Sequence, residues 1–384
     1  TQALWQEGPK ITVVRVSDAK VELVRLDSGL LAATFPSHPQ TLRVKILTWT
    51  GDAGRRADFQ SHADLSSRPE DLSALTKPGP RRWTESVTTR GNVGRGPGPF
   101  VIDTLTLPYE NPWRALLFVS GHDFFSNGDA AICTLHGDVW RVSGLDERLE
   151  SLRWTRLATG LFQPLGLRIV NDLVHVIGRD QITRLHDENG DGEADFYESF
   201  HNAIRTSEGG HDFVACLETD RAGNFFYSDP LGLHRVSPNG ARQETLAAGW
   251  RNPNGLSVSP DGVITVSPQE GEWTPASLIS EVKGGGWYGF GGPKVTPDRP
   301  LGYDPPLCWI PRYLDNSSGG EVWIPPNHWG ALGGQLLHLS YGRCQSMLVL
   351  RDVADGPAQG AIVPLKGRFL SGVLRGRFGP LDGH

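Results

Sequence analysis

The chain contains the stretch Leu157-Ala-Thr-Gly-Leu-Phe-Gln-Pro-Leu-Gly-Leu167, and further on a close copy, Leu246-Ala-Ala-Gly-Trp-Arg-Asn-Pro-Asn-Gly-Leu256. The copies agree at six of eleven positions, start 89 residues apart, and each leads into a short apolar strand, at residues 168–170 and 257–258. Half of this spacing is about 44 residues, the length of one four-stranded propeller blade. Residues 100–384 at this period predict an all-β, six-bladed β-propeller, with a β-sandwich as the alternative.

The composition also favours an all-β fold. Of 384 residues, 47 are glycine and 28 are proline. Because both residues break helices, this excess argues against a helical bundle. Short apolar stretches recur between turn signals such as Asn239-Gly240 and Pro260-Asp261-Gly262, and no long stretch has a 3.6-residue period. Twelve tryptophans against one methionine predict a rigid core anchored by aromatic side chains.

The pattern along the chain predicts three segments. Residues 11–26 alternate and are β-branched, and residues 41–48 have the pattern of another strand, which predicts an N-terminal β segment over 1–50. Residues 51–99 are polar and rich in Gly, Pro, Ser and Arg, which predicts an irregular linker. The propeller is expected over 100–384, with its last blade either truncated or completed by the N-terminal β segment.

Charge and cysteine usage exclude several classes of protein. With 37 Lys+Arg against 43 Asp+Glu the formal net charge is −6, so no nucleic-acid partner is expected. No apolar run approaches the roughly 18 residues that a membrane span needs. The absence of a Cys-x-x-Cys pair excludes a zinc ribbon and a covalently bound c-type haem within this chain. We expect the four cysteines to be free and buried: Cys133, Cys216, Cys308 and Cys344.

The segment Asp187-Glu-Asn-Gly-Asp-Gly-Glu-Ala-Asp-Phe-Tyr-Glu198 matches the calcium-loop pattern D-x-[DN]-x-[DN]-G-x5-E in full. The predicted ligands are five side chains and one backbone carbonyl: Asp187, Asn189, Asp191, Asp195 and Glu198, with the carbonyl of Glu193. The flanking residues 182–185 and 196–200 have the pattern of strands rather than of EF-hand helices. We therefore expect a structural calcium ion in a hairpin loop, with a solvated Asp/Asn/Gly turn as the alternative.

A second group of polar residues lies at turns that precede predicted inner strands. Arg251-Asn252-Pro253-Asn254 stands before one such strand, and Gln163 takes the related place in the other copy of the repeat. His211 precedes a strand predicted at 224–227, and Arg375-Gly376-Arg377 lies near the C-terminus. In a propeller such turns face the central channel, where planar donors can clamp an anionic ligand. The alternative for each residue is a turn side chain that bonds to the backbone.

Taken in order, these residues resemble the soluble glucose/sorbosone dehydrogenase family. The resemblance covers about residues 115–384 and rests on Gln163, His211, Gly249-Trp-Arg-Asn-Pro-Asn-Gly-Leu256, Val282-Lys-Gly-Gly285 and Arg375-x-Arg377. Members of the family are six-bladed propellers that hold pyrroloquinoline quinone (PQQ). The chain is most similar to bacterial sorbosone-dehydrogenase-like proteins, which are often fused to a haem-c domain; typical segments lie at 121–129, 178–185 and 315–320.

The resemblance implies a site and a mechanism. His211 would be the general base that takes the proton from the anomeric hydroxyl of a sugar, while hydride passes to a carbonyl of the quinone. A second calcium ion, bound by backbone oxygens near Gln269–Gly271, would polarise that carbonyl. Gln163 would help to orient the sugar. The residues that would hold the carboxylates of the cofactor are Arg251, Asn252, Arg375 and Arg377.

Two features depart from the family pattern. A lysine that touches the quinone in the family aligns near Gly342-Arg343, so Arg343 is the candidate replacement, although arginine is not equivalent to lysine. The loop Gln269-Glu-Gly-Glu-Trp273, which corresponds to the backbone calcium site, is also altered. Loss of the cofactor therefore stays open as an alternative.

Three functions are compatible with these patterns. The leading interpretation is an extracytoplasmic (periplasmic or secreted) PQQ-dependent dehydrogenase that oxidises a hydroxyl or hemiacetal of a small sugar. The second is a non-catalytic propeller that docks into a larger extracytoplasmic electron-transfer assembly, with a cytochrome or another protein as partner. The third is a carbohydrate lyase or hydrolase. Because one fold hosts many functions, the fold does not choose among them.

Overall fold

The computed structural model describes residues 1–17, 20–65, 68–98, 100–205, 209–272, 276–353 and 356–380. The chain divides into two compact units, Thr1–Lys77 and Pro78–His384. No helix in the described ranges is long and apolar enough to cross a membrane.

The smaller unit is built on a three-stranded antiparallel sheet in the order β1-β2-β5. Its strands are β1 (Gln2–Glu7), β2 (Lys10–Ser17) and β5 (Lys45–Asp52), with a separate hairpin of β3 (Glu22–Arg25) and β4 (Leu31–Thr34). Ile11 and Val13 of β2 are buried against Phe59 and Ala63 of α1 (Arg56–Leu65), so alternation along β2 gives this sheet one apolar face.

The larger unit contains five sheets that follow one another along the chain. In spatial order the first is β6 (Val87–Thr89), β10 (Leu152–Ala158), β9 (Val139–Ser143), β8 (Ala130–Thr134), β7 (Val119–Phe124). The second is β11 (Gly166–Val170), β12 (Leu173–Ile177), β13 (Ile182–His186), β14 (Phe196–His201). The third is β15 (Ala215–Thr219), β16 (Phe225–Asp229), β17 (Gly232–Val236), β18 (Gln243–Ala248), β22 (Gly286–Trp287).

The remaining two sheets have four strands each. The fourth is β19 (Arg251–Val258), β20 (Ile264–Gln269), β21 (Ser277–Glu281), β23 (Cys308–Ile310). The fifth is β24 (Ser318–Trp323), β25 (Leu336–Ser340), β26 (Gln345–Asp352), β27 (Gln359–Pro364). The strands pair antiparallel within each sheet except for β22, which joins β18 in parallel.

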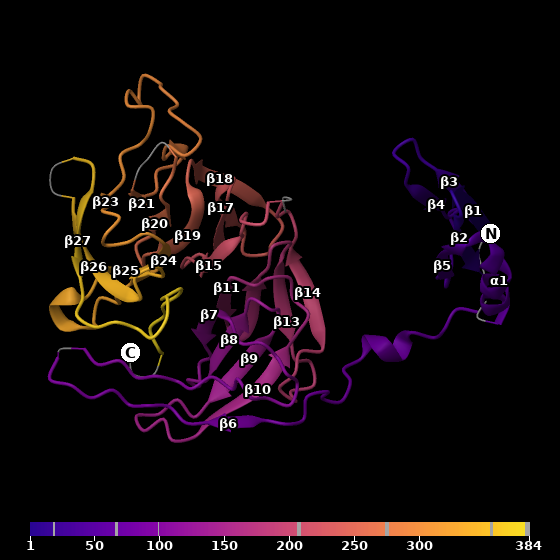
Figure 1. Cartoon of the computed structure of the whole chain (residues 1–384), viewed down its shortest axis with the longest axis horizontal. Coiled ribbons are helices and arrows are strands. Elements are labelled where there is room, and N and C mark those ends of the chain that lie inside the picture. The colour runs from indigo at the N-terminus through magenta and orange to yellow at the C-terminus, as the bar shows by residue number, and fades with distance from the viewer. Residues whose placement is uncertain are drawn as a thin grey trace. The chain divides into compact units, whose positions relative to one another are not determined.

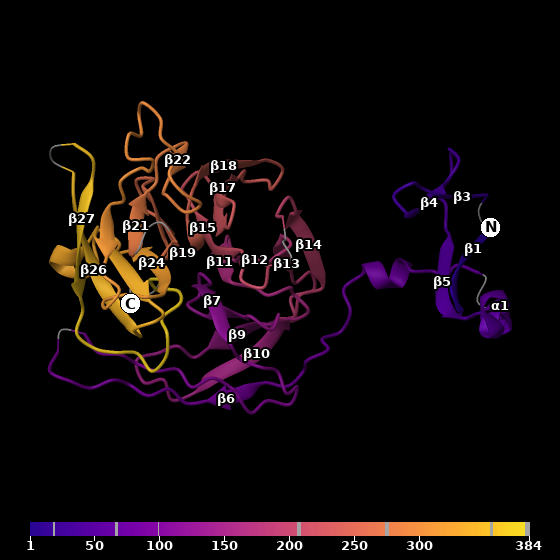
Figure 2. The same ribbon diagram turned by 45° about the horizontal axis from the view of Figure 1, so that its top comes forward.

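The five sheets are arranged like the blades of a propeller (Figures 1 and 2). The first strand of each blade lies at the centre, where β7 packs against β11, β11 against β15, β15 against β19, and β19 against β24. Stacking covers both faces of the middle sheets, which a single twisted sheet cannot do for itself. Aromatic side chains fill the spaces, and Trp140, Trp154 and Trp250 are fully buried, which confirms the predicted aromatic core.

The sequence repeat is also a repeat in structure. Gly160 and Gly249 both have left-handed φ angles, 83° and 92°, and so do Gln163 and Asn252, at 47° and 43°. Glycine adopts this conformation without strain, so it starts the turn in both copies. In both copies this turn is followed by an inner strand, β11 in the first copy and β19 in the second.

Irregular segments join the fifth blade to the first. The C-terminal segment 365–380 has no strand but runs beside β24, where Gly319 and Gly320 lie against the backbone of residues 373–375. From the side of the first blade, Phe100 packs on Trp329 with ring centroids 5.1 Å apart. These contacts hold the two ends of the blade array together without a further sheet.

These observations test the sequence predictions. The all-β prediction is confirmed, but the sixth blade is not, because the described residues form five such sheets and residues 365–380 contribute no strand to one. The N-terminal segment does not complete a blade, since β2 pairs with β1 and β5. The units divide inside the segment predicted as a linker, and β6 from that segment pairs with β10. All four cysteines are free, and Cys344 is half-buried rather than buried.

Candidate functional site

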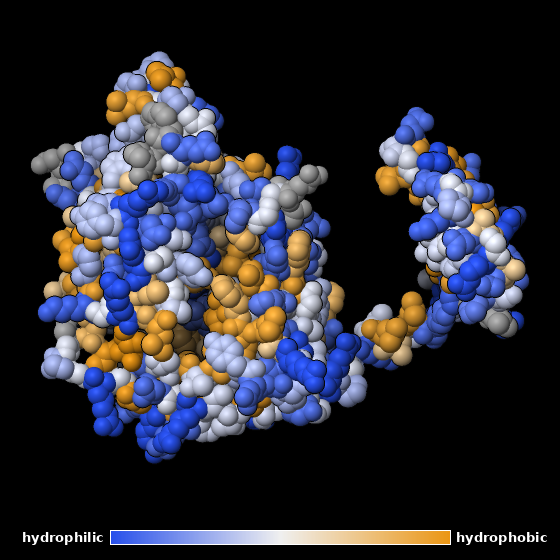
Figure 3. Space-filling model, viewed as in Figure 1, coloured by the Kyte–Doolittle hydropathy of each residue, from blue (hydrophilic) through white to orange (hydrophobic). Residues whose placement is uncertain are grey.

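A pocket of about 500 Å³ opens at the N-terminal ends of the inner strands. It lies at the centre of the blades, where Figure 3 shows a hollow with apolar residues gathered along part of its edge. The pocket is lined by residues of all five blades and the C-terminal segment: Phe118, Leu135, Leu165, His211, Phe213, Ala215, Arg251, Asn252, Asn254, Gln269, Ser317, Tyr341 and Leu374.

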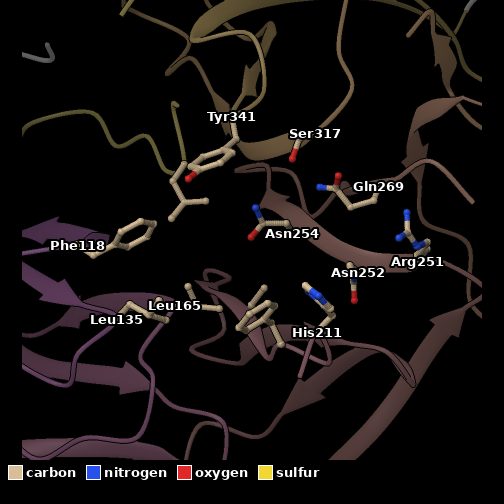
Figure 4. Close-up of a pocket in the computed structure, with 13 residues that line it drawn as sticks. Phe118, Leu135, Leu165, His211, Arg251, Asn252, Asn254, Gln269, Ser317 and Tyr341 are labelled. Carbon is tan, nitrogen blue, oxygen red and sulfur yellow. The ribbon is translucent and has the colours of Figure 1, made fainter. Parts of the chain in front are cut away.

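The pocket has two chemically different walls (Figure 4). Phe118, Leu135 and Leu165 form an apolar wall on the side of the first two blades. The opposite wall is polar and carries the three residues of the sequence prediction that come together here, His211, Arg251 and Asn252, beside Asn254 and Gln269. A ligand in this pocket would meet hydrocarbon on one side and hydrogen-bond donors on the other.

Irregular pairing at the start of the inner strands aims these side chains. The register between β19 and β20 shifts between Arg251 and Gly255, so the two asparagines of the repeat lie in a bulge. Comparable shifts occur near the starts of β7, β15 and β24. A bulge turns side chains away from the regular alternation of a strand and often stands next to a functional site.

The polar wall keeps hydrogen-bonding capacity for a ligand. Arg251 is exposed, and its Nη1 donates to the backbone oxygen of Glu270 at 3.0 Å, while its other guanidinium nitrogens have no acceptor among the described residues. His211 is exposed at the rim, 6.4 Å from Phe213 between ring centroids, and its imidazole has no hydrogen-bond partner within the described ranges. The side chain of Asn252 is likewise without a described partner.

Arg375 does not line the pocket, but it is bonded to two residues that do, Leu165 and Asn254. Its guanidinium donates to the backbone oxygen of Leu165 at 2.8 Å and to the backbone and side-chain oxygens of Asn254 at 3.2 and 3.0 Å. Leu165 and Asn254 occupy the same position in the two copies of the repeat. Arg375 therefore ties two inner strands together, and most of its donors are already used.

Gln163, Arg343 and Arg377, which were also predicted to hold the cofactor or the sugar, lie outside this pocket as well. Gln163 accepts a hydrogen bond from Nη1 of Arg179 at 3.1 Å. Arg343 donates to the backbone oxygen of Arg312 at 3.0 Å and is exposed. The side chain of Arg377 is buried, forms an ion pair of 2.8 Å with Glu218, and lines a different cavity, at the opposite ends of the inner strands. The structure thus separates Arg377 from His211 and Arg251.

The predicted calcium loop is the hairpin connection between β13 and β14, as expected. The Asp187 carboxylate accepts backbone N–H groups of Gly190, Asp191 and Gly192, whereas Glu198 turns to Nε2 of His186 at 2.7 Å. Glu193 accepts the backbone N–H groups of Arg82 and Trp83. The part of the chain that the structure describes contains no group of three or more His, Cys, Asp or Glu residues suited to a metal ion. Calcium binding here stays a prediction.

The second predicted calcium site is in the loop after β20. The carbonyl of Glu270 is engaged by Arg251, and the carboxylate of Glu270 by Arg312. The end of this loop, Trp273, lies outside the described residues.

The apolar wall of the pocket was not predicted from the sequence. Leu165 could have been found from the repeat, because its counterpart is Asn254, which was singled out. Phe118 and Leu135 have no such signal, since single apolar residues beside strands are ordinary in any β protein. Two buried thiols also lie near the axis, and burial raises the pKa of Cys133 and of Cys216 to about 11, so neither is a nucleophile at neutral pH.

No family model and no curated protein matches the chain. Solved structures are similar to it: a putative oxidoreductase (glucose dehydrogenase) from Thermus thermophilus is 17% identical, with a TM-score of 0.54 over 70% of this chain and 89% of that one. Two further glucose dehydrogenase structures are 16% and 14% identical, with TM-scores of 0.54 and 0.51; they cover 69% and 64% of this chain and 91% and 86% of their own. The chain therefore shares the fold of these glucose dehydrogenase structures.

Proposed function

We propose that the chain is a PQQ-dependent sugar dehydrogenase whose cofactor and substrate bind in the pocket lined by His211 and Arg251. The observation that carries this proposal is the pairing, in one pocket of about 500 Å³, of an apolar wall with a polar wall on which Arg251 and Asn252 keep unused donors; the amide nitrogens of Asn254 and Gln269 already donate to the backbone oxygen of Ser318. A planar quinone that bears carboxylates would match these two walls, because its flat ring faces are apolar and its carboxylate edge is anionic.

The residues present fit such a group in part. Arg251 has free guanidinium donors, and Asn252 and Gln269 stand beside it, so this edge would hold carboxylates. Phe118 and Leu165 would flank the ring system. Arg375 would contribute little beyond its charge, because backbone and Asn254 oxygens already occupy its donors. When bound, PQQ supplies a two-electron acceptor for hydride.

His211 would take the proton from a hydroxyl group of the sugar. The hydride would leave from the carbon that bears this hydroxyl. His211 is the only histidine among the residues that line this pocket, and its imidazole makes no hydrogen bond to a described residue that would block proton transfer. A general base of this kind contributes about 10²–10⁴-fold to the rate. Its exposed position leaves the imidazole accessible to a sugar that enters the pocket.

The test is dye reduction by the purified chain with added PQQ, Ca²⁺ and a panel of aldoses. We expect sugar-dependent reduction that His211→Gln lowers by about two orders of magnitude or more. His38→Gln, which changes an exposed histidine of the smaller unit, is the matched control and should retain activity. Absence of reduction with every sugar, or equal rates for both variants, would count against the proposal.

A non-catalytic docking subunit is the second candidate. The observation that favours it is that Arg343 and Arg377, two of the predicted cofactor residues, lie outside the pocket. This function predicts no uptake of quinone and co-purification with a protein partner in fixed ratio. Under either function, we also propose that the chain binds calcium, lies outside the cytoplasm and has a cytochrome as partner.

A further inference from the structure

A second cavity, of about 430 Å³, lies at the carboxyl ends of the inner strands. Along each inner strand the chain passes from the first pocket to this one: Leu165 leads to Arg168, and Asn254 leads to Ser257. Arg375 marks the boundary, since it binds the backbone at Leu165 and Asn254, whereas Arg377 lines the second cavity. The two cavities are thus separate sites on one axis.

Three arginines and three carboxylates line the second cavity, so its formal charge is balanced. The carboxylates are Asp123, Glu218 and Asp220, and the arginines are Arg168, Arg221 and Arg377.

Every carboxylate in the cavity already has partners. Asp123 accepts the backbone N–H of Phe124 at 3.0 Å and that of Ile169 at 2.9 Å. Glu218 pairs with Arg377 at 2.8 Å, and Asp220 accepts both the backbone and the side-chain N–H groups of Asn224. Little acceptor capacity is left for a ligand that donates hydrogen bonds.

The arginines have partners too, since Nη1 of Arg168 lies 3.3 Å from Asp123 and Nη2 of Arg377 lies 2.8 Å from Glu218, but several donors remain unused. Nε of Arg168, Nε of Arg377 and Nε1 of Trp323 are buried and have no acceptor among the described residues. Arg221 is exposed at the cavity, and its guanidinium forms no ion pair or hydrogen bond within the described ranges. Buried donors without acceptors are costly and call for a missing partner, such as water or an ion.

We propose that this second cavity binds a small oxyanion, a carboxylate or a phosphate, held by Arg221 at the mouth and by the arginine pair Arg168 and Arg377 within. An oxyanion supplies the acceptors that the cavity lacks, and guanidinium groups bind such planar or tetrahedral oxygens in pairs. A cavity of this volume accommodates a small organic anion. The site is independent of the quinone pocket and does not depend on the proposed dehydrogenase activity.

Calorimetric titration of the whole chain, without quinone, tests the site. The probes are sodium gluconate, inorganic phosphate and, as the uncharged analogue of gluconate, glucose. We expect saturable binding of gluconate or of phosphate, and the anion that binds more tightly identifies a carboxylate or a phosphate site. Any binding of glucose, which belongs to the substrate class proposed for the first pocket, should not change in Arg221→Ala. Arg221→Ala removes an exposed, unpaired side chain and should weaken binding about tenfold or more.

Two matched variants locate the binding. Arg242→Ala removes another exposed arginine far from the cavity lining and should change nothing, and Arg251→Ala alters the first pocket and should leave anion binding intact. The proposal is overturned if neither anion binds, if Arg221→Ala weakens glucose binding as much as anion binding, or if Arg221→Ala behaves like Arg242→Ala. Loss of binding in Arg251→Ala alone would place the anion in the first pocket and equally overturn it.

Discussion

His338 on β25 is fully buried between two carboxylates. Its Nε2 lies 2.8 Å from Asp315 and its Nδ1 lies 3.6 Å from Glu321. Asp315 also accepts the hydroxyls of Ser318 and Ser340, at 3.0 and 2.6 Å. The cluster fixes the start of β24 through the hydrogen bond between Asp315 and Ser318. The protonation state of His338 therefore affects the stability of the fifth blade.

Burial by itself lowers the pKa of His338, but the hydrogen bond to Asp315 and the negative charges of Asp315 and Glu321 outweigh it and raise the pKa from 6.5 to about 9. The folded protein therefore keeps a proton that the unfolded chain loses above about pH 6.5. The resulting stabilisation, about 3 kcal/mol, is fully present below that pH and is lost as the pH rises through about 9.

Equilibrium unfolding in urea at a series of pH values, followed by tryptophan fluorescence, measures this effect. His338→Gln keeps a polar side chain but cannot hold the charge, so the difference in unfolding free energy between wild type and variant isolates the contribution of His338. We expect that difference to shrink by about 3 kcal/mol between about pH 6 and pH 10. A difference that is independent of pH would refute the reasoning.

Three further predictions concern other parts of the larger unit. A Cβ on Gly319 would overlap the carbonyl oxygen of Val373. Gly319→Ala should therefore lower the free energy of unfolding, measured by urea titration, by about 2 kcal/mol or more. Gly284→Ala is the control and should have little effect, because a Cβ there meets open space. Thiol titration of the native protein should find Cys344 fast and the buried thiols slow; equal rates would contradict their burial. Burial lowers the pKa of His175 to about 4, so the wild type should lose stability relative to His175→Gln as the pH falls from about 6.5 to 4, and an unchanged difference would count against this.

Local features of the fold could be predicted from the sequence because they depend on near neighbours. The glycines at 160 and 249 permit the left-handed φ angles at which their turns begin, and the alternation within residues 11–26 favours strands. The number of blades could not be predicted in the same way. Whether residues 365–380 form a sheet depends on partners that are distant in sequence. In the structure this segment runs along β24 without forming a strand.

The residues of the candidate site also differ in whether their positions could be predicted from the local sequence. Arg251 and Asn252 belong to the repeat and lie at the start of β19, and His211 stands in the loop before β15, so the expectation that they begin inner strands was enough to bring them together. Arg377 follows Arg375 by two residues, and in an extended segment this spacing predicts the same face. The structure nevertheless pairs Arg377 with the buried Glu218, because an unpaired buried carboxylate is more costly than the loss of one cation from the first pocket.

The most direct measurement is a titration of the purified chain with PQQ, with and without Ca²⁺, followed by quenching of tryptophan fluorescence. If the pocket between Phe118 and Arg251 holds the quinone, binding saturates at one per chain, Arg251→Ala weakens it about tenfold or more, and Arg242→Ala leaves it unchanged. Absence of saturable binding, or equal affinity in the two arginine variants, would contradict the assignment of this pocket.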